Sequence, residues 1–480
     1  MRILQVNDFR SGGGAEVVVD ETIALLRERG HTVDHFTGED AGGTPGPLGY
    51  IHNRRAVRRL ADRIRATNPD VVHFHNVYHA LSPAVLDAAD GRPTVLTAHD
   101  FHLGCPNAGA AWFTRDGSRH AADPERLAAL GYLFSRRWDH RSAAHGGLKL
   151  LQHLWNHRFR GRRLQLGAVV CPGAGAAAWL ERAGAAEHVR VLPNPFDAGA
   201  ARRIAHATRA ADPIEWPAVP GPRLAFVGRI APEKGLAEVL EVWPEPNAGG
   251  HRSTVEPGTG GGTGSAGANN APSACLLVAG DGPDLERCQQ ITTARGLQRT
   301  VHFLGRQPRE RILGLIESAD ALLMPSRWPE VAPIVLVEAI ALGTPIVGSD
   351  FGAMREVIDE TNAGWFVDPF DSPGLADQLA AALHAMGKHA PADGDADAGV
   401  GVGVGVDVNA DVGENTRANT HPGDVEAIEQ FLEARTPAVY AAGLESVYAA
   451  VGAGEDDGDG GSTSTPTNAR ARVDLSPTAR

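Results

Sequence analysis

Short runs of aliphatic and β-branched residues alternate along this chain with longer amphipathic stretches, and this alternation restricts the fold more than any other feature. Six runs come before residue 193, at 3–6, 32–36, 71–75, 94–98, 168–171 and 189–192. Six more follow, at 223–228, 275–279, 301–304, 321–324, 344–347 and 364–367. Strands that alternate with helical segments form βαβ units with parallel strands. The sequence therefore predicts an α/β protein with two doubly wound, Rossmann-like domains.

A proline-rich segment separates the two series of runs. Residues 198–222 contain four prolines and are predicted to be an interdomain linker. The amino-terminal domain would then span residues 1–197 and the carboxyl-terminal domain residues 223–387. Two such domains place a ligand cleft between the carboxyl ends of their sheets.

Three segments have too few apolar residues to offset the entropy of ordering them. Residues 244–273 and 388–424 are predicted to be mobile insertions, and residues 452–480 a disordered tail. The first insertion falls between a helix and a strand, away from the carboxyl ends of the strands, so we expect it not to touch the cleft. A last helix is predicted at 425–451.

Charge and cysteine usage exclude several classes of protein. The 480 residues carry a formal net charge of −13, which argues against general nucleic-acid binding. The four cysteines lie far apart without a C-x-x-C pair, and we expect them to be buried and reduced. Met1 leads directly into the first strand, and no run of about 18 apolar residues occurs, which predicts a cytoplasmic protein without a membrane span.

Two glutamates lie near one strand end in the stretch PSRWPEVAPIVLVEA, residues 325–339. Glu330 is predicted in the loop after the strand at 321–324, and Glu338 on the second turn of the next helix. A carboxylate in so apolar a helix needs a partner. The vicinal hydroxyls of a ribose and a buried Glu–Arg pair are both open from the spacing alone.

The start of this helix suits an anion. Pro333 is predicted as its first residue, because proline is favoured there. The amides of Ala332, Ile334 and Val335 would then lack helical partners and could bind a phosphate.

These features belong to a larger pattern. The E-x7-E element of residues 330–338 resembles that of the retaining GT-B glycosyltransferases of family 4, also called group 1. Further motifs agree in order, namely GGGAE (12–16), TAHD (97–100), LPNPFD (192–197), VGRIAPEKG (227–235), VAGDGP (278–283) and VHFLG (301–305). The resemblance covers about residues 1–385 and the helix near the carboxyl terminus, and implies a GT-B fold with a C-terminal helix.

The resemblance also implies roles for matching residues. Arg229 and Lys234 would bind the diphosphate of a nucleotide sugar, Glu338 the ribose and Glu330 the hydroxyls of the transferred sugar. His99 would contact this sugar near its anomeric carbon. We therefore expect His99, Arg229, Lys234 and Glu330 to be catalytic. Without the resemblance, a histidine after a strand is more often a core or capping residue.

Glycines flank the two cations and strengthen this interpretation. Gly228 precedes Arg229 and Gly235 follows Lys234, whereas a solvated surface pair would need neither. Gly12, Gly13, Gly228 and Gly280 are assigned to the donor site. A dinucleotide-binding G-x-G-x-x-G is excluded because Val17 takes the place of the third glycine, and an ordinary tight turn at 12–14 stays open.

The sequence predicts no metal and no cofactor besides the nucleotide sugar. His73 and His75 share a strand face, but no further ligand lies at a suitable spacing. One departure from the family pattern is Gly173, because a serine commonly follows the proline there. The contact at Gly173 therefore stays open.

The function implied is retaining transfer of a sugar, with uridine diphosphate as the expected carrier, to an unknown acceptor that is a glycan, a lipid-linked molecule or a small molecule. The two alternatives are a nucleotide-sugar 2-epimerase and a non-catalytic sugar-nucleotide sensor. The presence of all the site residues disfavours the sensor.

Residues 136–163 concentrate positive charge in an acidic chain. They hold eight basic residues against Asp139 alone, with an apolar stripe at helical spacing between them. This pattern is typical of a helix on an anionic membrane. It also fits a core-packed helix whose arginines bind a diphosphate or acidic neighbours. A second basic stretch at 54–65 favours peripheral contact with the inner face of the cytoplasmic membrane.

Overall fold

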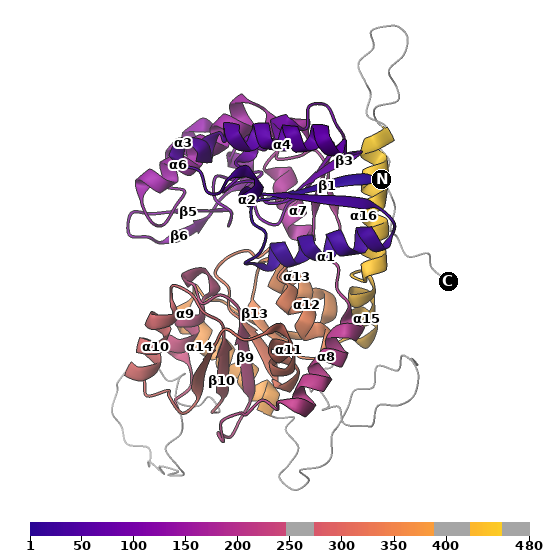
Figure 1. The fold of residues 1–480 in the computed structure, drawn as a ribbon. Coiled ribbons are helices and arrows are strands. Elements are labelled where there is room, and N and C mark those ends of the chain that lie inside the picture. Colours follow the sequence, from indigo (N-terminus) through magenta and orange to yellow (C-terminus); the bar gives the residue numbers. More distant parts are fainter. Residues whose placement is uncertain (246–272, 388–422, 454–480) are drawn as a thin grey trace, which may run out of the picture.

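The computed structural model describes residues 1–245, 273–387 and 423–453, which form two α/β domains stacked end to end (Figure 1). The segments predicted to be mobile or disordered (244–273, 388–424 and 452–480) lie outside the described residues except at their edges.

The first domain is built on a six-stranded parallel sheet with the order β2-β1-β3-β4-β7-β8. Its strands are β1 (Arg2–Asn7), β2 (Thr32–Thr37), β3 (Val71–Phe74), β4 (Thr94–Thr97), β7 (Ala168–Cys171) and β8 (Val189–Val191). All six predicted strands are confirmed. A short antiparallel pair, β5 (Ala111–Phe113) and β6 (Arg119–Ala121), was not predicted.

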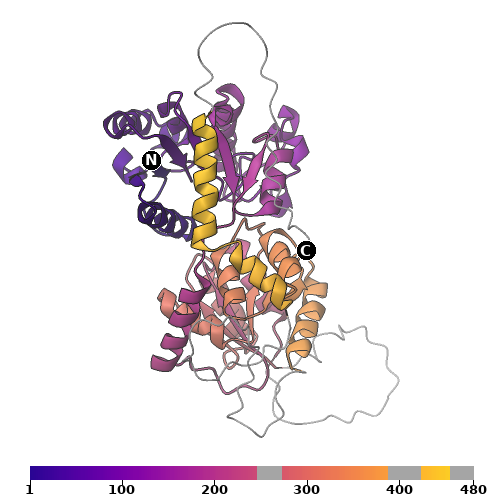
Figure 2. The same ribbon diagram turned by 90° about the vertical axis from the view of Figure 1, so that its right-hand side faces the viewer.

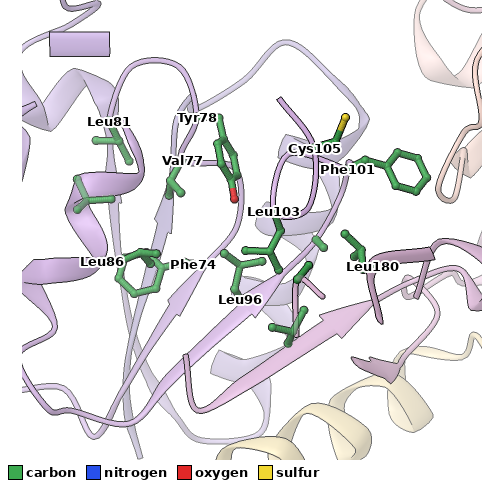
Figure 3. Packing of buried hydrophobic residues seen from close by; sticks show 14 of the residues in the cluster. Phe74, Val77, Tyr78, Leu81, Leu86, Leu96, Phe101, Leu103, Cys105 and Leu180 are labelled. Atoms are coloured by element: carbon green, nitrogen blue, oxygen red, sulfur yellow. The ribbon is translucent and has the colours of Figure 1, made fainter. Parts of the chain in front are cut away.

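Helices cover both faces of this sheet. They are α1 (Gly14–Glu28), α2 (Gly38–Ala41), α3 (Pro47–Ile51), α4 (Arg54–Thr67), α5 (Leu130–Phe134), α6 (Ala143–His153) and α7 (Ala174–Arg182). Short helical turns add η1 (Pro83–Ala88), η2 (Pro124–Arg126), η3 (Leu154–Phe159) and η4 (Arg162–Gln165). Figure 3 shows part of the core, where Leu96 of β4 lies between Phe74 of β3 and Leu103.

The second domain has another six-stranded parallel sheet, with the order β11-β10-β9-β12-β13-β14. Its strands are β9 (Arg223–Val227), β10 (Cys275–Ala279), β11 (Val301–Gly305), β12 (Ala321–Met324), β13 (Ile346–Ser349) and β14 (Gly364–Val367). β13 starts two residues later than predicted, after Pro345, which lacks the amide that a central strand uses. The helical elements are η5 (Pro232–Lys234), α9 (Leu236–Val242), α10 (Leu285–Ala294), α11 (Arg309–Ser318), α12 (Ile334–Ala341), α13 (Gly352–Thr361) and α14 (Ser372–Gly387).

The segment predicted as a linker is largely helical. Its first part forms α8 (Ala198–Ala211), and its prolines lie in the irregular stretch that follows. Ala201 and Ala205 of α8 are buried with Leu313 and Ile316 of α11. Small side chains at helical spacing let α8 pack closely, so the chain joins the second domain well before residue 223.

The predicted carboxyl-terminal helix is two helices, α15 (Val425–Glu433) and α16 (Pro437–Gly452). Pro437 starts the second one, because proline cannot continue a helix but fits its first turn. Figures 1 and 2 show α15 on the second domain and α16 lying along the first. Tyr440, Leu444 and Tyr448 of α16 are buried there.

The chain therefore passes between the domains twice, before α8 and again between α15 and α16. The two passages touch each other, because the amide of Phe196 donates to the carbonyl of Arg435 at 2.7 Å.

Candidate active site

The loop after β12 carries the first of the two predicted glutamates and lies at the domain boundary. Val331 is 7% exposed and packs within the core cluster of the first domain. A Cβ atom on Gly109, before β5, would lie 2.3 Å from the ring of Trp328. Asn194 Nδ2 donates to the carbonyl of Ala332 at 3.5 Å. The first domain thus holds this loop from three places.

Glu330 is held by residues of its own domain. Its Oε1 accepts from Lys234 Nζ at 2.5 Å and from Ser326 Oγ at 2.9 Å. The structure therefore brings Glu330 and Lys234 together, as their predicted roles around one ligand require. Arg229 lies exposed after β9, and among the described residues no acidic side chain pairs with it.

Glu338 is buried in α12 and meets Arg309, the first residue of α11. The carboxylate Oε1 lies 3.4 Å from Arg309 Nε. Burial raises the pKa of Glu338, Arg309 lowers it, and Glu21 of α1 raises it further. The Glu–Arg pair left open by the sequence is thus present. Its arginine side chain is 48% exposed, whereas that of Glu338 is 9% exposed.

The amino end of α12 matches the prediction to within one residue. Pro333 is the residue before the helix, rather than its first residue. Its carbonyl accepts from Leu336, and in the described chain no group accepts from the amides of Ala332, Ile334 or Val335. These donors can bind an anion at the boundary between the domains.

Two of the glycines assigned to the donor site, Gly228 and Gly280, allow the ends of two strands to approach closely. Gly228 and Gly280 follow β9 and β10 with φ angles of +143° and +154°. A Cβ atom on Gly280 would lie 1.8 Å from the carbonyl oxygen of Gly228. Only glycine fits this contact, and Arg229 extends from it.

The glycine-rich turn of the first domain opens α1. Gly12 has a φ of +128°, and Gly13 lies directly before the helix. A Cβ atom on Gly13 would lie 2.8 Å from Glu16 Oε2. Glu16 is fixed by Asn7, whose Nδ2 lies 3.3 Å from Glu16 Oε1.

His99 follows β4 and is partly exposed. Its Nε2 lies 3.0 Å from Nδ1 of His75, and the two rings stack. Burial lowers the pKa of His99 to about 4, so the ring is neutral near pH 7. His73 and His75 each bond through both ring nitrogens to other side chains. In the described parts of the chain, no three His, Cys, Asp or Glu residues are arranged to hold a metal ion.

Sequence reasoning missed Ser326 and Arg309, the polar partners of the two glutamates, and Trp328 between the domains. Both polar residues lie just beyond the carboxyl ends of strands, where the fold places ligand-binding groups. That position is a usable signal. The contact of Trp328 with Gly109 has none, because it depends on how the two domains are stacked.

The basic segment at 136–163 is partly neutralised. Arg141 and Lys149 pair with Asp139, and Arg160 and Arg162 with Asp87. The apolar stripe divides between two environments. Leu150 and Leu154 are buried. Leu151 is 49% exposed, Trp155 is 40% exposed and Phe159 is 68% exposed. Among the described helices, none is long and apolar enough to cross a bilayer.

Comparison with protein families finds a match for each domain. Residues 217–391 match the sequence model of glycosyl transferases group 1, and residues 12–199 match that of glycosyltransferase family 4. Neither match alone reaches half of the chain, and together they span both domains.

Curated relatives match over shorter stretches. The alpha-D-kanosaminyltransferase of Streptomyces kanamyceticus is 28% identical over 162 residues, which are 34% of this chain and 36% of that protein. The phosphatidyl-myo-inositol mannosyltransferase of Mycobacterium leprae is 39% identical over 108 residues, 22% of this chain and 28% of that protein. The matched part thus spans about a third of these relatives.

Solved structures match over nearly the whole chain. Sucrose-phosphate synthase from Thermosynechococcus elongatus has a TM-score of 0.59 at 15% identity, covering 95% of this chain and 100% of that one. Anabaena HepE, solved in complex with UDP, has a TM-score of 0.54 at 16% identity, covering 94% and 100%. At such identities the likeness shows the fold, and the predicted GT-B architecture is confirmed.

Proposed function

We propose that this chain, which carries the two domains of a GT-B group 1 glycosyltransferase, moves a sugar from a nucleotide donor to an acceptor bound by its first domain. The observation that carries the proposal is the cluster at the end of β12. There Lys234 and Ser326 orient the Glu330 carboxylate between the domains. A carboxylate held in this way can accept hydrogen bonds from the hydroxyls of a sugar.

The leaving group is a nucleoside diphosphate, and the second domain offers positive potential for it. Arg229, Lys234 and the amides at the start of α12 can all face the charge that develops on the diphosphate. With these groups no metal is needed. On donor binding, the ribose hydroxyls would replace Arg309 as the partner of buried Glu338. The Arg309 side chain can leave because it is half-exposed.

The finer proposal is retention of configuration with a UDP-sugar. The carboxylate of the cluster, Glu330, is bound by Lys234 and Ser326, which favours a role in binding over that of a nucleophile. Departure and attack would then occur on one face, assisted by the leaving diphosphate. His99 would contact the transferred sugar. The complexes of Anabaena HepE with UDP and with UDP-glucose support the choice of carrier.

A ligand screen tests the proposal directly. Thermal shifts with UDP-, GDP- and ADP-sugars should single out one nucleotide, because a donor at 100 times its Kd stabilises by about 2.7 kcal/mol. The selected donor should then lose its sugar to an acceptor or slowly to water. An isomerised sugar nucleotide without acceptor would indicate the epimerase instead, and binding with no turnover would indicate the sensor.

We further propose that the enzyme works as a peripheral protein at the inner face of the cytoplasmic membrane. The exposed side chains of Leu151, Trp155 and Phe159 follow each other at four-residue spacing, so they share one face. Leu48 of the neighbouring α3 is 85% exposed. Arg158 and Arg160 flank this apolar face, which is the arrangement that anionic lipids favour.

Cosedimentation with vesicles tests the membrane proposal. Binding to phosphatidylglycerol-containing vesicles but not to phosphatidylcholine vesicles, lost in high salt, is expected. Replacing Leu151, Trp155 and Phe159 by Ser should abolish it, and Arg158→Gln with Arg160→Gln should weaken it by about 1 kcal/mol per charge. Ile204→Ser, at an exposed apolar position on α8, is the matched control. Absence of binding at low salt would leave an enzyme with a water-soluble acceptor.

A further inference from the structure

A chain of buried hydrogen bonds joins the carboxyl-terminal helix to His99. The Tyr448 hydroxyl of α16 lies 3.2 Å from Nε2 of Gln5, whose Oε1 lies 2.7 Å from Nε2 of His75. Nδ1 of His75 lies 3.0 Å from Nε2 of His99. Tyr448 and Gln5 are fully buried and His75 is 1% exposed. A residue near the end of the described chain is thus connected to the histidine of the cleft.

The chemistry of each group gives these bonds a direction. An amide oxygen only accepts, so Nε2 of His75 carries a proton and donates it to Gln5. A neutral imidazole has one N–H group, so Nδ1 of His75 must accept, and Nε2 of His99 must donate to it. Nδ1 of His99 is then left with a free lone pair.

A second branch of hydrogen bonds runs from Tyr448 through His73 to Thr97, and its directions follow from the same rules. The Tyr448 hydroxyl accepts from the Gln5 amide, so its own proton goes to Nδ1 of His73 at 2.7 Å. Nε2 of His73 then donates to the Thr97 hydroxyl at 2.8 Å. Each of the five bonds in the two branches then has one donor and one acceptor, so turning the Gln5 amide would reverse all of them together.

The free nitrogen of His99 faces solvent. In the described chain no side chain or carbonyl bonds to Nδ1 of His99, and this atom is absent from the buried nitrogens that lack partners. It is therefore accessible just beyond the carboxyl end of β4. A ring nitrogen with a lone pair accepts from a hydroxyl and cannot donate to one.

We propose that Tyr448 and Gln5 are positioning residues that hold His99 as the Nε2–H tautomer, so that Nδ1 accepts a hydrogen bond from a hydroxyl of the donor sugar. The ligand part of this inference rests on the proposed function, whereas the tautomer is a property of the free protein. Carbohydrate hydroxyls are the matching class, because they can donate where an amide oxygen or a carboxylate cannot.

Nitrogen NMR of the protein with ¹⁵N-labelled histidine tests the tautomer. The His99 signals are assigned from their loss in His99→Gln, and they should show a protonated Nε2 and a bare Nδ1. Tyr448→Phe and Gln5→Met should each replace this pattern by a mixture of tautomers. In the same variants kcat should fall by at least about tenfold, since only one tautomer accepts from the sugar.

Tyr440→Phe is the matched control, because it removes another buried hydroxyl from the same helix. Tyr440 bonds to Thr22 at 2.9 Å and has no link to His99. It should lower the melting temperature much as Tyr448→Phe does, but leave the His99 signals and kcat as in the wild type. A protonated Nδ1 in the wild-type protein would overturn the proposal. So would equal losses of kcat in both tyrosine variants, which would reduce the role of Tyr448 to helix docking.

The same spectra separate this inference from the proposed function. A wild-type protein that shows the expected tautomer, yet transfers no sugar from any donor, would refute the function and leave the positioning network standing.

Discussion

At the scale of single residues, Glu330 and Glu338 differ in how tightly neighbouring side chains bind their carboxylates. Glu330 is already bound by a cation and a hydroxyl at short distances, so it is oriented before any ligand arrives. Glu338 has only a long contact with a half-exposed arginine, and burial raises its pKa. Glu338 is therefore the residue whose partner can be replaced on binding.

Glu338→Gln should weaken nucleotide-sugar binding by about 1.5 to 3 kcal/mol, because a neutral amide is a poorer acceptor for two hydroxyls than a carboxylate. Calorimetric titration measures this loss. Glu317→Gln is the control, since Glu317 is another partly buried carboxylate with an arginine partner, Arg209, but lies between α8 and α11. Unchanged affinity in a folded Glu338→Gln protein would assign this residue to a structural ion pair.

Lys234→Ala and Arg229→Ala should each lower kcat by roughly 100-fold, because the charge that these cations meet grows in the transition state. Arg299→Ala, an exposed arginine at the opposite end of the same sheet, should leave kcat unchanged. Wild-type activity should survive EDTA. Loss of activity on chelation, restored by adding back a metal, would contradict the metal-free mechanism.

Candidate residues within a short motif could be picked out from the sequence, whereas pairs joined across the chain could not. Motifs near strand ends, together with the family resemblance, predicted Arg229, Lys234, Glu330 and Glu338 as site residues, and the structure brings Lys234 and Glu330 into contact. The bond between Gln5 and Tyr448 joins residues 443 positions apart. No local spacing encodes such a pair, because it depends on where α16 docks.

At the scale of elements, the strand pattern predicted both sheets but not the helices that bind the domains together. Short apolar runs in the sequence predict buried strands. α8 and α16 pack mainly through alanines and scattered aromatic residues, a weaker signal whose partner depends on tertiary structure. For this reason the sequence placed α8 in a linker and missed the break at Pro437.

The contact at Gly173, open in the sequence, is a close approach between the domains. Its φ of −118° suits any residue, but an added Cβ atom would lie 2.3 Å from the carbonyl oxygen of Val331. Gly173→Ala should therefore push the loop after β12 away from the first domain, at a cost of about 1 to 3 kcal/mol. The melting temperature and kcat/KM for the donor should both fall.

Gly131→Ala is the control for this change, because a Cβ atom there would meet nothing within 4 Å. If Gly173→Ala behaves like Gly131→Ala in both measurements, the close approach does not hold the domains in their active arrangement.

At the scale of the whole molecule, the first domain holds a group of buried histidines. Burial lowers the pKa of four of them, to about 3 for His73 and His153 and well below the ordinary 6.5 for His75 and His157. Both ring nitrogens of His157 lack partners. These rings must lose their packing before they can bind protons.

Stability should therefore fall as the pH decreases from about 6.5 to 4. In this window the unfolded chain binds protons that the folded protein cannot, and each histidine costs about 1.4 kcal/mol per pH unit. Asp8 opposes them, because burial raises its pKa to about 7 and its contribution is lost as the pH rises. The four buried histidines outweigh this one carboxylate. Melting temperatures at pH 5, 6 and 7.5 measure the net effect.

His157→Phe should flatten this pH dependence, because it removes one proton-binding group while filling the same space. His145→Gln, at an exposed histidine, should leave it unchanged. A melting temperature that stays constant or rises from pH 7.5 to pH 5 would show that the buried histidines are protonated in the folded protein.

The hydrogen bond between Phe196 and Arg435 has a consequence for how the molecule can move. Both chain passages between the domains meet at this point, so they form a paired hinge at one edge of the cleft rather than two separate tethers. A single passage would let one domain swivel freely over the other. Two passages fastened side by side favour rotation of the domains about an axis through this point, and such a rotation would separate Trp328 from Gly109.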